Sequence, residues 1–333
     1  MYSISILMTE SISSGILLPS PEQVAAYVQG FGDSSPVLTA PEQEGHHSKI
    51  YICQNGPAAL PDTFIIRHGR KSGGCDEIEK QYRQLEYLNG DLAPRALHFD
   101  RPQSLGGLAI AFEEFISGGA KDLNTLDVDE TKLLARAVSQ IHNHSSAGYS
   151  KRSGTVADTQ GTYADYLWSM LDESVTQRLA SLDLSSYPAA SRLVEAGFRR
   201  AERMVARKLF QASDFRRLHH DLSRFNILFS QDGVVFIDWN YTEGDPADDV
   251  SYILDDNRVS AGFRSVFLNE YADINPQGHA TIERIGAFSL KNQLDDYAWT
   301  IAMREYHRSC PHTEQYTEAC SERQAILEDS LLS

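Results

Sequence analysis

Apolar residues occur mainly in short, strand-like runs between residues 36 and 112, and mainly at helical spacing in the rest of the chain. Short runs rich in β-branched and aromatic residues are typical of strands, and they occur at residues 36–39, 49–53, 63–66, 93–99 and 108–112. Between the third and fourth runs, residues 76–89 carry one apolar stripe at helical spacing, formed by Ile78, Tyr82, Leu85 and Leu88. The pattern therefore predicts a small antiparallel sheet of five strands with one helix.

Helical patterns flank this sheet on both sides. Ser20, Pro21 and Gln23 form a capping-box start, which predicts a helix from Pro21 that ends near residues 30–32. After the sheet, apolar stripes predict helices at residues 127–143, 163–171, 188–210, 260–272, 276–306 and 313–332. We interpret residues 1–19 as an N-terminal leader, 20–116 as one lobe and 117–333 as a second, mainly helical lobe.

Composition narrows the class of protein. The chain has 333 residues, 41% of them hydrophobic and 23% charged, as in an ordinary globular protein. The formal net charge of −16 speaks against binding nucleic acid or an anionic membrane, because both reward basic patches. The sequence holds no secretory signal and no transmembrane run, and its four cysteines are widely spaced. We expect a cytoplasmic protein without nucleic-acid or membrane partners.

Residues 218–249 concentrate the candidate chemistry. Two apolar runs, 226–229 and 234–237, flank the turn signal Asp232-Gly233, which predicts a β-hairpin. Such a hairpin brings Asp221 and Asn226 near Asp238. Two carboxylates and one amide suit Mg²⁺, with one carboxylate left over as a base.

The spacing of these residues resembles that of one known family. His219-x-Asp221 is followed at a spacing of five by Asn226, then by Asp238-Trp239, and then by Gly244-Asp245-Pro246-x-x-Asp249. This order is similar to that of the aminoglycoside phosphotransferase/choline kinase family. Two positions depart from the family pattern: His220 stands where Gly is usual, and Ser223 where His is frequent.

The resemblance implies a fold, a reaction and cofactors. The fold would be α+β and protein-kinase-like, with two lobes: a five-stranded, nucleotide-binding N-lobe and a helical C-lobe that holds the catalytic loop and the acceptor site. The reaction would be transfer of the γ-phosphate of ATP to a hydroxyl of a small molecule. Asp221 would be the catalytic base with His219 in support, Asn226 and Asp238 would bind Mg²⁺, and Asp249 would hold the catalytic loop from outside the metal site.

The resemblance also assigns roles in the N-lobe. Gly45 and Ser48 lie in the turn that would cover the nucleotide phosphates, although a plain hairpin turn is equally consistent with this stretch. Arg67 takes the position of the ATP-anchoring cation, and a helix glutamate, Glu79 or alternatively Glu77, would pair with it. Backbone groups of the linker between the lobes would bind adenine, and this linker comprises Glu113, Glu114, Phe115 and Ile116.

The acceptor is less well defined. Asp295, Asp296 and Trp299 lie on the kind of C-terminal helix that faces substrate in the resembled family, and acids and aromatics there suit an amine-bearing, aminoglycoside- or choline-like alcohol. An ordinary amphipathic helix is the alternative interpretation of these three residues.

Three other functions stay open at this stage. A catalytically silent nucleotide-binding module would keep the fold without turnover. A protein kinase is disfavoured by Ser223, which replaces the usual lysine, and by Trp239. A nucleotidyl transferase on the same fold would release a different nucleotide product.

Overall fold

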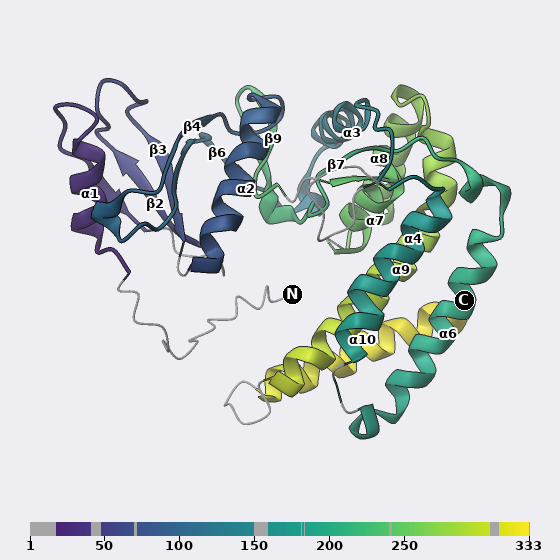
Figure 1. Cartoon of the computed structure of the whole chain (residues 1–333). Coiled ribbons are helices and arrows are strands. Elements are labelled where there is room, and N and C mark those ends of the chain that lie inside the picture. Colours follow the sequence, from purple (N-terminus) through teal and green to yellow (C-terminus); the bar gives the residue numbers. More distant parts are fainter. Residues whose placement is uncertain are drawn as a thin grey trace. The chain divides into compact units, whose positions relative to one another are not determined.

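The computed structural model describes residues 18–40, 48–69, 72–149, 159–180, 182, 184–239, 242–256, 258–306 and 313–332 (Figure 1). The chain forms two compact units. Unit 1 comprises residues 1–119 and 227–239, and unit 2 comprises residues 120–226 and 240–333. The domain boundaries predicted above stay a prediction.

Unit 1 is built on the predicted five-stranded antiparallel sheet. Its strands run in the order β1-β2-β3-β5-β4. Their bounds are β1 Val37–Thr39, β2 Ser48–Gln54, β3 Phe64–Gly69, β4 Ala96–Asp100 and β5 Ile110–Glu114. All neighbouring strands pair antiparallel. The antiparallel sheet predicted from the apolar runs is therefore confirmed.

The two faces of this sheet bury different residues, because side chains alternate along a strand. Helix α1 (Pro21–Gln29) packs Val24 and Val28 against the face that carries Phe64 and Phe112. Its predicted capping box is present, with reciprocal hydrogen bonds between Ser20 and Gln23. Helix α2 (Ser72–Leu88) packs on the other face, where Ile78 meets Ala109 and Ala111.

A hairpin from the later part of the chain also belongs to unit 1. Strands β8 (Ile227–Ser230) and β9 (Gly233–Phe236) pair across the Asp232-Gly233 turn, as predicted, and β6 (Gly118–Ala120) pairs with β8. Gly118 allows this close approach, because a Cβ there would lie 2.5 Å from the carbonyl oxygen of Phe229. The hairpin thus carries Asp238 into the unit that contains Arg67.

Unit 2 is mainly helical. Its α-helices in the described residues are α3 Val128–His142, α4 Tyr163–Leu171, the short α5 Gln177–Ala180, α6 Pro188–Val205, α7 Pro246–Asp256, α8 Ala261–Ile274, α9 Gly278–Tyr306 and α10 Thr313–Leu332. A short antiparallel pair, β7 (Arg216–Leu218) and β10 (Thr242–Gly244), lies among them. None of the helices in the described part of the chain is both long and apolar enough to cross a membrane.

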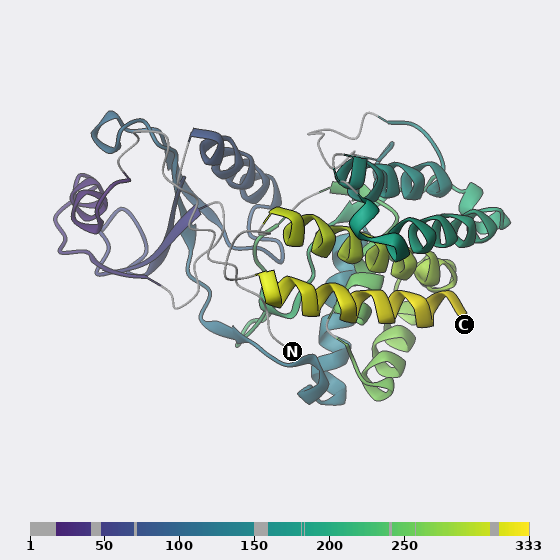
Figure 2. The ribbon, with the colours of Figure 1, turned by 90° about the horizontal axis from the view of Figure 1, so that it is seen from below.

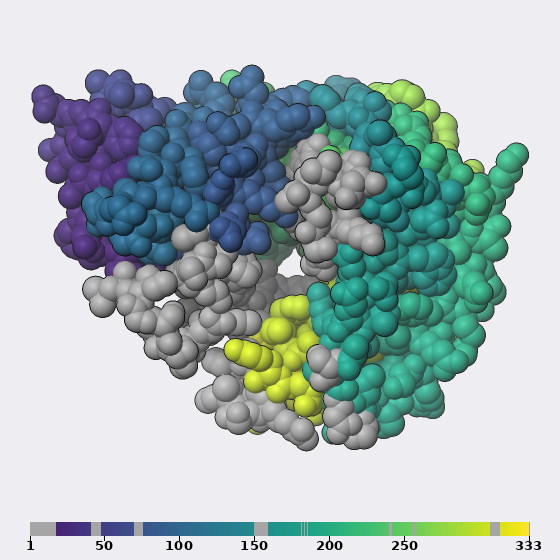
Figure 3. All heavy atoms as spheres, viewed as in Figure 1, coloured from purple at the N-terminus to yellow at the C-terminus, as the bar shows by residue number. Residues whose placement is uncertain are grey.

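Helix α9 is the centre of unit 2. It contacts α4, α6, α7, α8 and α10, and α10 lies along it (Figure 2). Its buried positions lie on more than one side, which is expected for a helix surrounded by other helices. Helix α6 lies at the outer surface in the space-filling view (Figure 3). Arg199 and Arg203 of this helix are exposed, as are Arg207 and Lys208 just after its end, whereas Arg200 is half-buried.

Candidate active site

The loop that follows β7 is held by one buried carboxylate. Asp249 lies in the first turn of α7, and its side chain is fully buried. Its Oδ2 accepts the backbone N–H of His219 at 2.8 Å, and its Oδ1 accepts the backbone N–H of His220 at 2.7 Å. The predicted contact between Asp249 and the catalytic-loop backbone is therefore present, while its effect on catalysis stays a prediction.

A histidine from α3 completes the surroundings of Asp249. His142 Nε2 lies 3.2 Å from Asp249 Oδ2, and His142 Nδ1 lies 2.7 Å from the Tyr271 hydroxyl. Burial alone would raise the pKa of Asp249, but these bonds and the N–H of His219 outweigh it and lower the pKa. Asp249 is thus a carboxylate, and it connects the loop to α3 and α8.

Asp221 and Asn226 are tied to each other within the same loop. The backbone N–H of Asp221 donates to Nδ1 of the buried His219 at 3.2 Å. The side-chain amide of Asn226 donates to the backbone carbonyl of Asp221 at 2.9 Å. The Asp221 side chain is half-buried. The loop therefore presents one carboxylate on a backbone that is held from both sides.

In unit 1 the structure places Arg67 between two carboxylates. Arg67 lies on β3, and its guanidinium is 2.9 Å from Glu113 and 2.7 Å from Asp238. Glu113 lies on β5, where register places Ala111 opposite Arg67, so that Glu113 points to the same face two residues away. Burial raises the pKa of Glu113, although Arg67 acts in the opposite direction. Glu113 was predicted only as a backbone contact, so the sequence did not reveal the role of its side chain.

The predicted pairing of Arg67 with a helix glutamate is wrong. The Glu79 carboxylate bonds to Arg83, four residues along the same helix, and to Arg101, whose Nη2 lies 2.8 Å away. Glu113 and Asp238 already surround the guanidinium of Arg67. The register of β3 and β5 brings Glu113 to Arg67, whereas Glu79 is occupied by Arg83 and Arg101.

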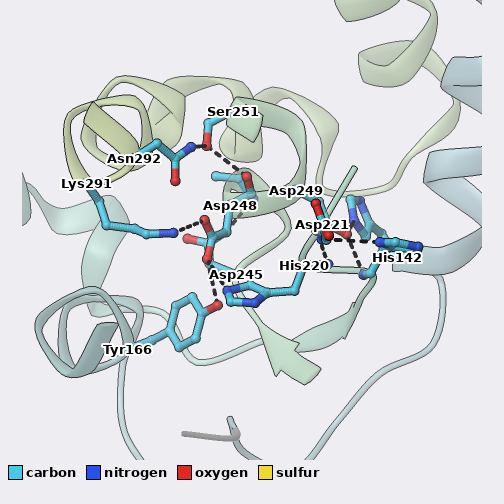
Figure 4. A network of polar contacts seen from close by, with 12 residues as sticks. His142, Tyr166, His220, Asp221, Asp245, Asp248, Asp249, Ser251, Lys291 and Asn292 are labelled. Atoms are coloured by element: carbon cyan, nitrogen blue, oxygen red, sulfur yellow. Dashed lines mark hydrogen bonds and ion pairs between the residues drawn. The ribbon is translucent and has the colours of Figure 1, made fainter. Parts of the chain in front are cut away.

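A second buried acid beside the loop anchors side chains from three elements (Figure 4). Asp248, on α7, lies 2.8 Å from Lys291 Nζ of α9 and 2.8 Å from the Tyr166 hydroxyl of α4. The His220 imidazole approaches it from the loop, with Nε2 3.5 Å from Asp248 Oδ2. Burial acts to raise the pKa of Asp248, but Lys291 and His220 outweigh it and hold the pKa far below its ordinary value. Asp248 occupies an unspecified position of the sequence motif, so the sequence did not reveal this network.

Another acid of the motif has a structural partner. Asp245 is fully buried and receives two hydrogen bonds from Arg284 of α9, at 2.6 and 2.7 Å. The Arg284 guanidinium also stacks over the ring of Tyr163, 4.0 Å from its centroid. Such a forked pair joins the start of α7 to α9 and satisfies both buried charges.

Each of the two predicted magnesium ligands keeps a side-chain oxygen available within its own unit. Asp238, whose side chain is 44% exposed, meets Arg67 and Gln81 through Oδ1, so Oδ2 is available. The amide nitrogen of Asn226 is used by Asp221, so its oxygen is the atom left for a ligand. No group of three or more His, Cys, Asp or Glu in the described residues could hold a metal. Carboxylate and amide oxygens are both ligands that Mg²⁺ accepts, so each residue by itself suits the role predicted for it.

The remaining predicted residues lie in varied surroundings. Ser48 is the buried first residue of β2, whereas Gly45 lies outside the described residues. In the linker, Glu114 uses its backbone N–H to bond the Arg95 carbonyl at 2.9 Å. Phe115 is exposed and Ile116 is half-buried.

The three residues predicted to face substrate already have neighbours on other helices. The Asp295 carboxylate pairs with Arg178 of α5, and Asp296 lies 3.5 Å from Arg323 of α10. Trp299 packs edge-on against Tyr316. Of the two acids, Asp296 is the more exposed, at 52% of its side chain against 23% for Asp295.

Comparisons with known proteins agree with the resemblance found in the motif. Residues 43–284, more than half of the chain, match the model of a family described as the phosphotransferase enzyme family. Among curated proteins, the chain is similar to a Protein LicA homolog from Mycoplasma capricolum, with 33% identity over 57 residues. That match covers 17% of this chain and only 24% of the LicA homolog.

Solved structures of about the same length share the fold. Choline kinase LicA from Streptococcus pneumoniae has a TM-score of 0.61 at 17% identity, over 93% of this chain and 98% of that one. A thermostable mutant of aminoglycoside phosphotransferase APH(4)-Ia, solved with AMP-PNP and hygromycin B, has a TM-score of 0.63 at 15% identity, again over 93% and 98%. These matches confirm the predicted protein-kinase-like fold.

Proposed function

We propose that this chain, which belongs to the phosphotransferase enzyme family, moves the γ-phosphoryl group of ATP to a hydroxyl group of a small molecule. The observation that carries the proposal is the loop from His219 to Asn226, which presents Asp221 while Asp249 holds its backbone. The prediction that the chain is a small-molecule kinase is confirmed at the level of the family. The nucleotide, the metal and the acceptor are the proposed part.

Asp221 orients the acceptor in this mechanism. Its carboxylate accepts a hydrogen bond from the acceptor hydroxyl and takes the proton late, because the transition state of phosphoryl transfer is loose. Holding that hydroxyl in line with the phosphorus contributes as much as basicity does. His219 supports this position by accepting the backbone N–H of Asp221, and Asp249 holds the two residues that precede it.

Asn226 and Asp238 would hold Mg²⁺ through their side-chain oxygens. When bound, the ion neutralises charge on the transferring phosphoryl group. Arg67 acts on the same charge through its fork of N–H donors. Glu113 orients the guanidinium, because its carboxylate accepts the Nε–H of Arg67 and leaves the other N–H donors to Asp238 or a phosphate.

The choice of ATP rests on the family and on the linker. Residues Glu113 to Ile116 supply backbone groups that would bind the adenine edge, and Ser48 begins the strand that follows the proposed phosphate-covering turn at Gly45. The aminoglycoside phosphotransferase of similar fold was crystallised with the ATP analogue AMP-PNP, which supports nucleotide binding here.

The acceptor is an amine-bearing alcohol in this proposal. One solved structure of similar fold is a choline kinase, and another is an enzyme solved with hygromycin B. Choline combines a quaternary ammonium with a hydroxyl, and hygromycin B combines amino groups with hydroxyls. The net charge of −16 favours a cationic molecule. Asp296 is the better candidate to meet an amine, because its side chain is 52% exposed against 23% for Asp295, although each acid has an arginine partner.

The test is ADP release from Mg·ATP across a panel of choline, ethanolamine, aminoglycosides and uncharged sugars. We expect acceptor-dependent ADP with the wild-type protein and a loss of about 10²–10⁴ in rate for Asp221→Asn, with ATP affinity nearly unchanged. Asp238→Ala should also weaken Mg·ATP binding. The matched control is Asp273→Asn, an exposed acid on α8, which should keep wild-type turnover.

Other results would point to other functions. Wild-type turnover in both Asp221→Asn and Asp238→Ala would refute the site. AMP as the nucleotide product would indicate nucleotidyl transfer, and incorporation of phosphate into protein would indicate a protein kinase. Binding of Mg·ATP without turnover on any acceptor would favour a silent binding module.

A further inference from the structure

Gln81 is a polar residue on the side of α2 that packs against the sheet. It lies three residues after Ile78 and four before Leu85, both of which are buried, so the three side chains share one side of the helix. Ile78 packs against Ala109 and Ala111 of the sheet, and Gln81 is half-buried. A polar side chain in such a place is expected to meet a polar partner.

The partner of Gln81 is the predicted metal ligand of unit 1. Its side-chain amide donates to Asp238 Oδ1 at 3.4 Å, and Arg67 Nη2 lies 2.7 Å from the same oxygen. Two donors, one from α2 and one from β3, therefore converge on Oδ1. Because the carboxylate of an aspartate rotates about a broad, two-fold torsion, holding one of its oxygens from two directions also fixes the direction of Oδ2.

The backbone of Asp238 is held by separate bonds. Its φ angle is +54°, in the left-handed region that few residues other than glycine adopt, and such a conformation persists where neighbouring contacts compensate for it. The Trp239 indole donates to the Phe236 carbonyl at 2.8 Å, and the Phe236 N–H donates to the Leu92 carbonyl, which follows α2, at 2.8 Å. These bonds place the backbone of Asp238, and the two donors on Oδ1 place its side chain.

An uncharged amide at position 81 suits the charges around it. Arg67 already faces two carboxylates, Glu113 and Asp238. An ionised glutamate at position 81 would bring a third acid to one guanidinium and would offer Oδ1 no donor. The acid of α2 predicted to pair with Arg67, Glu79, instead bonds to two other arginines. Gln81 is therefore a residue through which α2 reaches Asp238.

We propose that Gln81 is a positioning residue for the metal: its amide orients the carboxylate of Asp238 so that Oδ2 meets the cation of the Mg·nucleotide complex. The inference deepens the proposed function and rests on it, because it concerns the same site. Removing a partner of this kind, which holds a metal ligand without touching the metal, typically costs about 10–100-fold in metal affinity. The long bond of 3.4 Å places the expected loss at the lower end of that range.

The first test measures binding of Mn²⁺, a paramagnetic substitute for Mg²⁺, to the whole protein with ADP by electron paramagnetic resonance. Gln81→Leu removes the donor and keeps a similar volume, so we expect Mn²⁺ to bind about tenfold more weakly. Gln81→His keeps an N–H donor and should restore most of the affinity. The matched control is Gln84→Leu, the same change three residues further along α2, which should bind as the wild type does. Equal affinity in the wild type and Gln81→Leu overturns the proposal.

A double-mutant cycle separates action through Asp238 from a general effect on folding. We expect Gln81→Leu to have little further effect on Mn²⁺ binding in an Asp238→Asn background, because the amide acts through that carboxylate. The Tm of Gln81→Leu should match or exceed that of the wild type, since leucine extends the apolar stripe of α2. Additive losses of affinity in the double variant, or a loss accompanied by a lower Tm, overturn the inference.

Turnover distinguishes failure of this inference from failure of the proposed function. If the variants bind Mn²⁺ with the expected pattern but the wild type transfers phosphate to no acceptor, the proposed function fails and the positioning role of Gln81 stands. If the wild type turns over and Gln81→Leu keeps both its KM for Mg·ATP and its Mn²⁺ affinity, the inference fails alone. A wild-type protein that binds no Mn²⁺, with or without ADP, refutes both.

Discussion

Replacing Asp249 by alanine tests the idea that one carboxylate holds the catalytic loop. In the folded protein Asp249 accepts two backbone N–H bonds, of 2.8 and 2.7 Å, and faces His142 at 3.2 Å. Alanine removes all three contacts. It leaves the N–H groups of His219 and His220 without an acceptor at a position where the carboxylate itself was fully buried.

The expected cost follows from these contacts. Each hydrogen bond to a buried charge contributes about 1.5–3 kcal/mol, and each buried donor left unpaired costs about 1–3 kcal/mol. Removing the carboxylate also removes its own desolvation penalty, which offsets part of the loss. We therefore expect Asp249→Ala to lower the free energy of unfolding by about 3–5 kcal/mol, the range for breaking a buried charged contact. A loss of this size is a large fraction of the stability of an ordinary domain.

The assay is urea unfolding followed by circular dichroism, with kcat measured under native conditions. Asp273→Ala, at an exposed position of α8, serves as the control and should change stability by no more than about 0.5 kcal/mol. Asp249→Asn should lose less stability than Asp249→Ala but more than the control Asp273→Ala. Its side-chain oxygen still accepts one backbone N–H, whereas its NH₂ group is a donor that faces the other N–H. If Asp249→Ala unfolds at the wild-type urea concentration with unchanged kcat, the carboxylate does not hold the loop and the reasoning fails.

Three further predictions concern packing, pH and the arginine of unit 1. Gly244→Ala would place a Cβ 2.4 Å from the Tyr166 ring, so we expect a loss of about 1–3 kcal/mol from overpacking, measured by urea unfolding; unchanged stability would show that the ring shifts freely. Because the pKa of Asp248 is lowered in the folded protein, its carboxylate stabilises the fold fully above the unfolded pKa of about 3.9, and this stabilisation is lost as pH falls further. The free energy of unfolding should therefore decrease less steeply with falling pH in Asp248→Asn than in the wild type. Equal slopes in the two proteins would contradict this. Glu113→Ala leaves Arg67 with Asp238 as its remaining carboxylate partner and should cost about 3 kcal/mol or more, together with a higher KM for ATP; a thermal scan and ATP titration that match the wild type would refute the pairing.

Local pattern predicted much of the fold, because its signals lie within a few residues of one another. The capping box at Ser20, the turn at Asp232-Gly233 and the apolar stripe of α2 all produced the predicted elements. The helix predicted at residues 188–210 is shorter, since α6 ends at Val205 and a 3₁₀ turn follows. Helix ends depend on capping and tertiary contacts, so they are harder to predict than the helix itself.

The partner of Arg67 shows where local reasoning failed. The sequence offered Glu79 and Glu77 on a helix close in the chain. The sheet instead places Glu113 beside Arg67, 46 residues away, through the register of β3 and β5. Nothing in the local pattern of residues 110–114 marks Glu113 as a buried acid, because alternation specifies which face a residue points to but not which charge lies opposite.

The sequence by itself pointed to the family, the order of the main elements and the candidate residues of the loop, because a motif is a set of residue types at fixed spacing. Only the tertiary structure decided which partner each acid of that motif binds. Asp249 binds the loop backbone, Asp245 pairs with Arg284, and Asp248 gathers side chains from α4, α9 and the loop. Those partners lie 28 to 82 residues away from the acids they contact. Each charge requires a partner because it is buried at the centre of unit 2.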